Sequence, residues 1–394
     1  MKIAKKTQLI SLLLFVIATG TALPLSAQNA NAPFVQFPVF RYFDVKPAPK
    51  TWGIKADALL GFRIFDGVDT ALWVRGEAAY KLVNYFRTGD LGLYRQDIFP
   101  DIGYDRTNLQ KAIMLWGLGI QQGLHFNAAR DRDDAMLLLS WRGAWTIPTS
   151  FNAADALLRT GSDPYKDQIL VNSFQADFLY DDANTDPVTK VRSGWWFDLS
   201  AEYAPPGISI PASVNYAQFS TTTKGFLPLF SRASERGWNE VSVYLGASAS
   251  VDYIAGFGTD ATNGIPYPVS QRFGGRVYQE GLGGAVRGLG EGWADGTFKL
   301  AGSLELRCNL PAVYRSDILV GTLAFLDAGY YAAPPGMPKQ SALQSGTYVT
   351  TGLGVYLDVF DKGYIAAYST VMLNAVNYQN KYWEPLSFEL GLHF

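Results

Sequence analysis

The stretch Leu386–Phe394 constrains the fold most strongly, because its residues alternate strictly between apolar and polar side chains. Successive side chains of a β-strand point to opposite faces of the sheet. One face of this stretch is therefore apolar and ends on an aromatic residue, as shown by Leu386, Phe388, Leu390, Leu392 and Phe394. The other face carries Ser387, Glu389, Gly391 and His393. The stretch is predicted to be a strand with one apolar and one polar face.

The same period-two alternation recurs along the chain. In Trp195–Tyr203 the apolar side chains oppose Asp198, Ser200 and Glu202, and Val241–Asp252 follows the same pattern. About 13 such segments can be counted: Lys55–Phe65, Asp69–Tyr80, Ala112–Phe126, Ala135–Trp145, Ile169–Tyr180, Trp195–Tyr203, Ala212–Phe219, Val241–Asp252, Thr297–Arg307, Ile318–Tyr330, Tyr348–Val359, Tyr364–Leu373 and Leu386–Phe394. Single-chain bacterial barrels have an even number of strands. We therefore expect further strands near Pro38–Val45 or Gly225–Ser231.

The first residues predict export from the cytoplasm. Lys2, Lys5 and Lys6 precede the apolar run Leu9–Ala18, and the small residues Ser26 and Ala27 follow. This order is typical of a signal peptide, here cleaved before Gln28. The apolar run is too short to span a bilayer as a helix, which weighs against a retained anchor. The predicted organisation is a signal peptide at 1–27, a short lead-in at 28–50 and one β-barrel domain at 51–394.

Composition narrows the fold class. The single cysteine, Cys308, cannot form an intramolecular disulfide, so an exported fold of this length needs another means of closure. Aromatic residues make up 14% of the chain, with 22 Tyr and 10 Trp, which suits the aromatic girdles of a membrane barrel. Mean hydropathy is close to zero at +0.01, which excludes a bundle of membrane-spanning helices. We predict an all-β fold, a closed antiparallel transmembrane β-barrel in the bacterial outer membrane and in contact with its lipid.

A glycine-rich segment, Gly281–Gly292, is the densest motif in the chain. Glycine permits tight chain reversal but offers no side chain to hold a loop in place. Arg287 is the strong multidentate donor in this segment, and a guanidinium folded into a narrow lumen needs carboxylate partners.

Two such carboxylates follow in the sequence. Alternation in Thr297–Arg307 turns Glu305 inward, and alternation in Ile318–Tyr330 turns Asp327 inward. We therefore predict that Arg287 pairs with Glu305, with Asp327 or with both. Three unconnected charges in the lumen are the alternative.

At these residues the chain resembles the BamA superfamily of outer-membrane assembly factors, which includes the TamA-type and two-partner-secretion transporters. That family carries a Val-Arg-Gly-aromatic tip on a long loop, then a Leu-Glu strand and a Phe-x-Asp-x-Gly strand. The matching residues here occur in the same order: Val286, Arg287, Gly288 and Leu289 at the tip, then Leu304 and Glu305, then Phe325, Asp327 and Gly329. The resemblance covers roughly residues 271–394 and implies a barrel of about 16 strands with the loop folded into the lumen.

The chain also departs from the family pattern. Leu289 replaces the aromatic residue of the tip, and residues 28–50 leave no room for the periplasmic POTRA domains that normally precede the barrel. The resemblance therefore implies a barrel-only member whose periplasmic or outer-membrane protein partners include one that bears POTRA domains. By resemblance to barrel proteins generally, the terminal strand with Phe388, Leu390, Leu392 and Phe394 is implied to be the signal that the assembly machinery recognises.

Enzymatic functions find little support. The chain has two histidines, His125 and His393, and only His125 lies near acidic residues, namely Asp131, Asp133 and Asp134. An interface histidine followed by a charged turn accounts for that pattern better than an acid/base pair. No nucleotide loop, metal-ligand spacing or calcium loop is present in the sequence. We predict no catalytic residue, no metal and no cofactor, and a net charge of −2 excludes a nucleic-acid partner.

Three functions stay open at this point. The resemblance implies protein insertion or translocation at the outer membrane, through a weak junction between the first and last strands. Pro385 and Gly391 shorten the pairing of the last strand, which favours this function. A passive pore for small solutes is the alternative, with its lumen lined by Arg75, Glu77, Asp198, Glu202 and Asp327. The third is a surface-structural role for the long loops at 87–108, 148–166 and 256–293.

Overall fold

The computed structural model describes residues 34–42, 51–65, 68–88, 92–95, 105–130, 132–148, 168–235, 237–258, 264–266, 286–288, 297–313, 317–332, 346–359, 363–374 and 382–392. For the strands before residue 112, mainly the backbone pairing is described. The predicted signal peptide at 1–27 lies outside the described residues.

The described chain is all-β, as predicted. Its strands are β1 (Phe34–Tyr42), β2 (Thr51–Phe65), β3 (Val68–Thr88), β4 (Gly92–Arg95), β5 (Asp105–Asn127), β6 (Arg132–Pro148), β7 (Ile169–Asp181), β8 (Asn184–Thr185), β9 (Arg192–Ala204), β10 (Tyr216–Ala233), β11 (Asn239–Gly256), β12 (Phe298–Asn309), β13 (Ile318–Ala332), β14 (Gly346–Val359), β15 (Gly363–Met372) and β16 (Trp383–Leu392). No helix in this part of the chain is long and apolar enough to cross a membrane.

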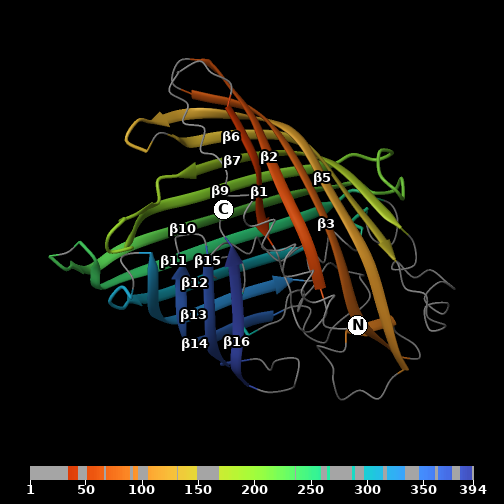
Figure 1. Ribbon diagram of the computed structural model, residues 1–394. Helices are drawn as coiled ribbons and strands as arrows, with labels where there is room; N and C mark the ends of the chain where they lie inside the picture. Colours follow the sequence, from red (N-terminus) through yellow and green to blue (C-terminus); the bar gives the residue numbers. More distant parts are fainter. Residues whose placement is uncertain are drawn as a thin grey trace, which may run out of the picture.

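These strands form one antiparallel sheet. Among the described residues, fourteen strands follow one another in the order β1-β2-β3-β5-β6-β7-β9-β10-β11-β12-β13-β14-β15-β16, while β4 pairs with β3 and β8 with β9. The sheet curves strongly, and β16 approaches β1 (Figure 1). No ladder between β1 and β16 is described, so closure of the barrel and the expected count of 16 strands stay predictions.

Every segment with predicted alternation overlaps an observed strand, but Ala212–Phe219 begins before β10, whose first residue is Tyr216. One of the further strands that we expected needs correction. Gly225–Ser231 is not a separate strand but the second half of β10, which continues through Pro228. The ladder with β11 shifts register between Pro228 and Phe230, and this bulge accommodates a residue that cannot donate a hydrogen bond. At the other end, β1 covers Pro38–Tyr42 and pairs with β2, so a further strand is present near Pro38–Val45 as expected.

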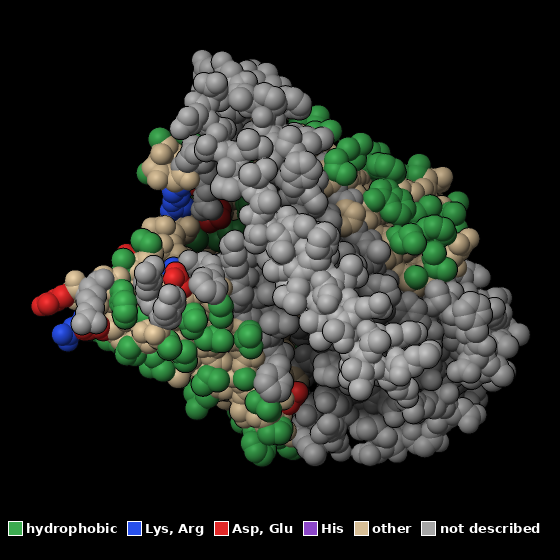
Figure 2. All heavy atoms as spheres, viewed as in Figure 1, with side chains coloured by type: hydrophobic (Ala, Val, Ile, Leu, Met, Phe, Trp, Pro, Cys, Tyr) green, Lys and Arg blue, Asp and Glu red, His purple; other side chains and the backbone are tan. Residues whose placement is uncertain are grey.

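Burial follows the predicted alternation closely. On β12, Leu300, Leu304 and Leu306 are 44–45% exposed, whereas Lys299 and Glu305, which alternate with them, are at most 1% exposed. Figure 2 shows hydrophobic side chains spread over the outer surface, with acidic and basic side chains confined to a few places. An outward apolar face and an inward polar face are the arrangement that a membrane barrel requires.

The connections between strands differ in length at the two ends of the sheet. Long connections join β3 to β5, β6 to β7, β11 to β12 and β13 to β14, and antiparallel order places all of them at one end, here called the loop end. Short connections such as those between β5 and β6 and between β10 and β11 lie at the opposite end, here called the turn end. Outer-membrane barrels show the same asymmetry.

Candidate functional site

The tip Val286-Arg287-Gly288 lies inside the curved sheet, against its inner face. Val286 is 2% exposed and Arg287 7% exposed, although both belong to a connection rather than to a strand. Gly288 has a φ of 84°, in the left-handed region that favours glycine. A Cβ atom at Gly288 would lie 2.7 Å from Cγ2 of Thr370 on β15. Glycine therefore allows the tip to turn where it meets the wall.

Arg287 donates all of its described hydrogen bonds to β12 and β13. Its Nε donates to Oδ2 of Asp327 at 2.8 Å, and its Nη2 donates to Oδ1 of the same carboxylate at 2.8 Å. Its Nη1 donates to Oε2 of Glu305 at 2.6 Å, and Nη2 also donates to Oγ of Ser303 at 3.0 Å. The backbone N–H of Arg287 completes the set by donating to Oδ2 of Asp327 at 3.0 Å. We call these contacts of Arg287 with Asp327, Glu305 and Ser303 the tip contact.

The strand register places these partners together. Ser303 on β12 lies directly opposite Asp327 on β13, and Glu305 lies opposite Phe325. Ser303 Oγ donates to Oδ1 of Asp327 at 2.6 Å, and Glu305 also accepts a hydrogen bond from Nε of Arg307. Two guanidinium groups thus face two carboxylates within the buried wall. Such balance is needed because an unpaired buried charge is costly.

Aromatic rings complete the surroundings of the guanidinium. The Cζ atom of Arg287 lies 3.6 Å from the centroid of the Phe325 ring and 5.9 Å from that of Tyr368. The two rings meet edge to face with centroids 5.9 Å apart. Gly352 on β14 leaves the room that Phe325 occupies, since a Cβ there would lie 2.5 Å from Phe325 Cζ. A cation held between carboxylates and a ring face has a restricted orientation.

The structure therefore brings together Val286, Arg287, Glu305, Phe325 and Asp327, all of which the sequence singles out. Gly329 faces inward on β13, two residues beyond Asp327. Leu289 lies outside the described residues, as do the side chains of Phe388, Leu390 and Leu392 and the whole of Phe394.

Sequence reasoning missed two contributors to this site, Ser303 and Tyr368. Alternation turns Ser303 inward, but only the register between β12 and β13 sets it opposite Asp327. Tyr368 belongs to β15, which is distant from the motif in sequence and lies near β13 only because β14 pairs with both strands. Neither residue carries a signal in the sequence that would identify it.

The lumen is also filled at the loop end. The connections before β10 and after β11 fold inward, and Val214 and Ile265 are each 2% exposed there. They pack with inward-facing strand residues in one apolar cluster: Ala144, Ile169, Val171, Ala204, Tyr216 and Ile254. The connection between β9 and β10 is fixed to β7, because the backbone N–H of Asn172 donates to Oγ of Ser209 at 2.9 Å.

At the turn end, the connection between β7 and β9 folds into the lumen. The backbone carbonyl of Thr189 accepts from Oγ of Ser242 at 2.7 Å and from Nδ2 of Asn309 at 3.3 Å. Val191 packs there with Phe226 and Tyr244. The backbone N–H of Thr189 donates to Asp186 in the same turn and holds the pKa of that carboxyl below its usual range. Within the described residues, the lumen thus contains protein at three levels along its axis.

The described acidic residues that follow His125 lie at the start of β6, next to the turn that joins it to β5. His125 is exposed, whereas Asp133 and Asp134 are buried. Asp134 accepts from Nδ2 of Asn127 at 2.6 Å and forms an ion pair with Arg130 at 3.5 Å. These contacts fix a turn. Asp131 and His393 lie outside the described residues, and no cluster of metal-ligating side chains is found in the described part of the chain.

Comparison with solved structures agrees with this geometry. The chain superposes on BamA from Haemophilus ducreyi lacking POTRA domains 1–3 with a TM-score of 0.50 and 14% identity, covering 92% of this chain and 70% of that one. This chain has the BamA-type barrel fold. CdiB from Escherichia coli gives a TM-score of 0.49 at 12% identity, and CdiB from Acinetobacter baumannii gives 0.47 at 12%. The chain covers 54% and 52% of those two proteins.

Comparison of the sequence itself gives no such relative. No protein-family description and no curated protein matches the sequence. The BamA-type fold is therefore established by structure, and the tip contact lies at the motif residues through which the sequence resembles this superfamily.

Proposed function

We propose that this chain acts at the outer membrane in the insertion of proteins into that membrane or in their translocation across it, without enzymatic chemistry. The observation that carries the proposal is the tip contact, in which a loop residue is fixed to the inner wall by five hydrogen bonds. A loop fixed in this way limits free passage along the lumen. Client proteins would therefore use another part of the barrel, and we propose that they use the junction between β1 and β16.

The edge strand β16 has features that suit this role. Its ladder with β15 shifts register between Tyr368 and Thr370, where Pro385 and Leu386 form a bulge. An edge strand with unpaired backbone groups can template an incoming strand from another chain. Because the ladder between β15 and β16 is short and interrupted, β16 can exchange its pairing for an incoming strand at lower cost. A partner bearing POTRA-like domains would deliver the client protein to this junction.

The contents of the lumen weigh against a passive pore for small solutes. Of the acidic residues expected to line such a pore, Asp198 and Glu202 are 4% and 9% exposed. Glu202 accepts a hydrogen bond from Oη of Tyr216 at 2.7 Å, and Asp327 is part of the tip contact. The side chains of Arg75 and Glu77 lie outside the described residues.

Depletion of the protein from its cells tests the proposal. We expect the amount of folded, heat-modifiable outer-membrane barrels or of a secreted protein to fall several-fold. The wild-type chain should restore these levels and Asp327→Ala should not. Glu240→Ala, which alters an exposed ion pair with Arg232, is the control and should restore them. Unchanged protein levels together with reduced uptake of small solutes would instead identify a pore.

A further inference from the structure

The connection between β7 and β9 forms a small hairpin that leaves the wall of the barrel at the turn end. The ladder between β7 and β9 ends at the pair of Asp181 and Trp196. Beyond this pair, β8 and the first residues of β9 form a separate two-stranded ladder, in which Asn184 lies opposite Ser193. The chain therefore changes direction between the two ladders. Residues 183–193 are here called the hairpin.

The base of the hairpin has the properties of a hinge. Gly194 has a φ of 91°, and a Cβ atom there would lie 2.6 Å from the backbone oxygen of Asp182. The backbone N–H of Asp182 donates to the backbone carbonyl of Trp195 at 2.9 Å. Arg130, in the neighbouring turn between β5 and β6, donates to the backbone carbonyls of residues 181–183. The base is thus fixed to the wall, while glycine allows the chain to bend directly after it.

The far end of the hairpin is attached to the opposite side of this wall segment, on β11 and β12. Asn309 of β12 is 1% exposed, and its Nδ2 donates to the backbone carbonyls of Thr189 at 3.3 Å and Lys190 at 3.4 Å. The same Nδ2 donates to Oγ of Ser242 on β11 at 2.8 Å. Oδ1 of Asn309 accepts a hydrogen bond from Oη of Tyr356 on β14. One asparagine therefore joins the hairpin to three strands.

The attachment of the hairpin is weaker in kind than the tip contact. Its hydrogen bonds join neutral groups, and such bonds are roughly half as strong as those that involve an ionised group. The apolar part is small, with Val191 packed against Phe226 and Tyr244. Lys190 has a φ of 56°, a left-handed conformation that a lysine adopts at a cost. The hairpin itself is stiff, because Asp186 accepts hydrogen bonds from backbone N–H groups of its turn.

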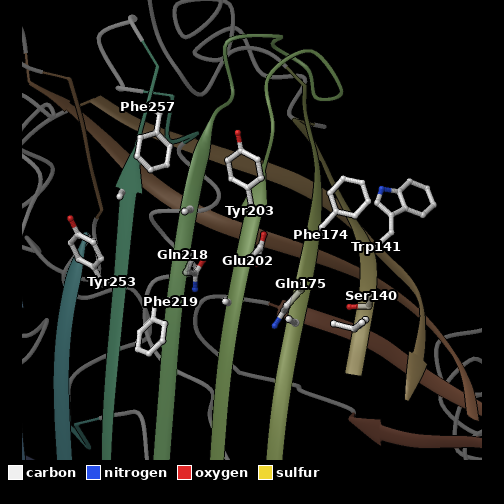
Figure 3. A pocket seen from close by; sticks show the side chains of 15 residues that line it. Ser140, Trp141, Phe174, Gln175, Glu202, Tyr203, Gln218, Phe219, Tyr253 and Phe257 are labelled. Carbon is white, nitrogen blue, oxygen red and sulfur yellow. The ribbon is translucent and has the colours of Figure 1, made fainter. Parts of the chain in front are cut away.

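The space that the hairpin covers has polar walls. On the neighbouring strands β7 and β9, Gln175 and Glu202 are turned to the inner face, whereas Phe174 is turned to the outer face (Figure 3). On β11, Tyr244 contacts the hairpin, and Ser248 lies four residues farther from the turn end. Polar walls of this kind suit water and small polar solutes.

We propose that the hairpin is a hinged plug that closes the turn end of the lumen, with Asn309 as its latch. In outer-membrane barrels the short turns face the periplasm, so the plug would exclude small polar solutes on that side. The tip contact lies farther along the lumen, at the level of Ser248. The two closures are held by different residues, so release of one leaves the other in place. The plug depends on the barrel fold but not on the proposed function in protein insertion or translocation.

Cysteine accessibility tests the plug. The purified chain, with Cys308→Ser to remove the native thiol, is placed in vesicles and treated with a charged methanethiosulfonate reagent. Val191→Cys reports on the hairpin itself, and Ser248→Cys reports on the space behind it. Both thiols should react slowly while Asn309 is present. Asn309→Leu, which removes the donor and keeps the size of the side chain, should accelerate both reactions about tenfold or more.

A buried asparagine at the loop end supplies the matched control. Nδ2 of Asn172 donates to the backbone carbonyl of Ile208 at 2.6 Å, so Asn172→Leu makes the same chemical change away from the hairpin. It should leave both rates unchanged. Heat-modifiable migration checks that each variant is folded, and Ser242→Ala supplies a second way to weaken the latch, with a smaller acceleration of both reactions.

Three results would overturn the proposal. Rapid reaction of the thiol at position 248 while Asn309 is present would mean that the turn end is open. Acceleration at position 191 without acceleration at position 248 would mean that the hairpin moves but does not close the lumen. Unchanged rates at both positions in folded Asn309→Leu would mean that Asn309 is not the latch.

Discussion

Replacing Asp327 by Ala is expected to release the tip of the inward loop from the barrel wall. The change removes three of the hydrogen bonds made by Arg287 and the one that Ser303 donates. It also leaves two guanidinium groups beside the one remaining carboxylate, that of Glu305. Breaking a buried ion pair costs about 3–5 kcal/mol, and water in the lumen lowers that cost. We expect faster proteolysis within residues 259–296 of the folded variant than within the same residues of the wild-type chain.

A double-mutant cycle isolates the contact. Arg287→Ala and Asp327→Ala should each increase the rate of cleavage, and the double variant should show less than the sum of the two effects because both remove one interaction. Asp198→Ala, which changes another buried acid of the wall, on β9, is the control and should leave cleavage of the loop unchanged. Strictly additive effects would mean that Arg287 and Asp327 do not act together.

The second large effect is expected at Lys299 and Asp252. Lys299 is fully buried, and its Nζ lies 3.5 Å from Oδ2 of Asp252 on the neighbouring strand. Asp252→Ala should leave the ammonium group without this partner and destabilise the barrel by about 3 kcal/mol or more. The measurement is the temperature at which the heat-modifiable form is lost, which should fall clearly.

Two further sets of variants test whether burial determines the cost of losing an ion pair. The double change Lys299→Met with Asp252→Leu should recover most of the lost stability, because apolar residues of similar volume often replace a buried pair without cost. Glu240→Ala breaks a shorter ion pair, at 2.7 Å, but Arg232 and Glu240 are 70% and 40% exposed. It should change stability by less than about 1 kcal/mol. Equal effects at the two pairs would show that burial does not determine the cost.

The alternation of apolar and polar residues predicts most of this fold because its period matches that of a strand. It places the inward residues of β9, β11, β12 and β13 correctly, including Glu305 and Asp327. The pattern is less informative where the chain departs from regular pairing. Pro228 interrupts the alternation, so the bulge in β10 hides the continuity of that strand.

Contacts between strands are harder to predict than the faces of single strands. Alternation states which side chains point inward, but it does not state which of them lie at the same level on neighbouring strands. Ser303 reaches Arg287 only because of the register between β12 and β13. On the outer face, Ala176, Ala201, Ala217 and Ala255 form one band only because of the registers of β7, β9, β10 and β11 together, and no local pattern in the sequence predicts these registers.

Site-specific photo-crosslinking in living cells tests the proposed function most directly. A photoreactive amino acid is placed at Leu386 of the edge strand β16 and, as the control, at Leu304 of β12, which is also exposed on the outer face. We predict crosslinks from position 386 to outer-membrane or secreted proteins during their synthesis, and none from position 304. Crosslinks to lipid alone at both positions, in cells whose barrel proteins assemble normally, would contradict the account.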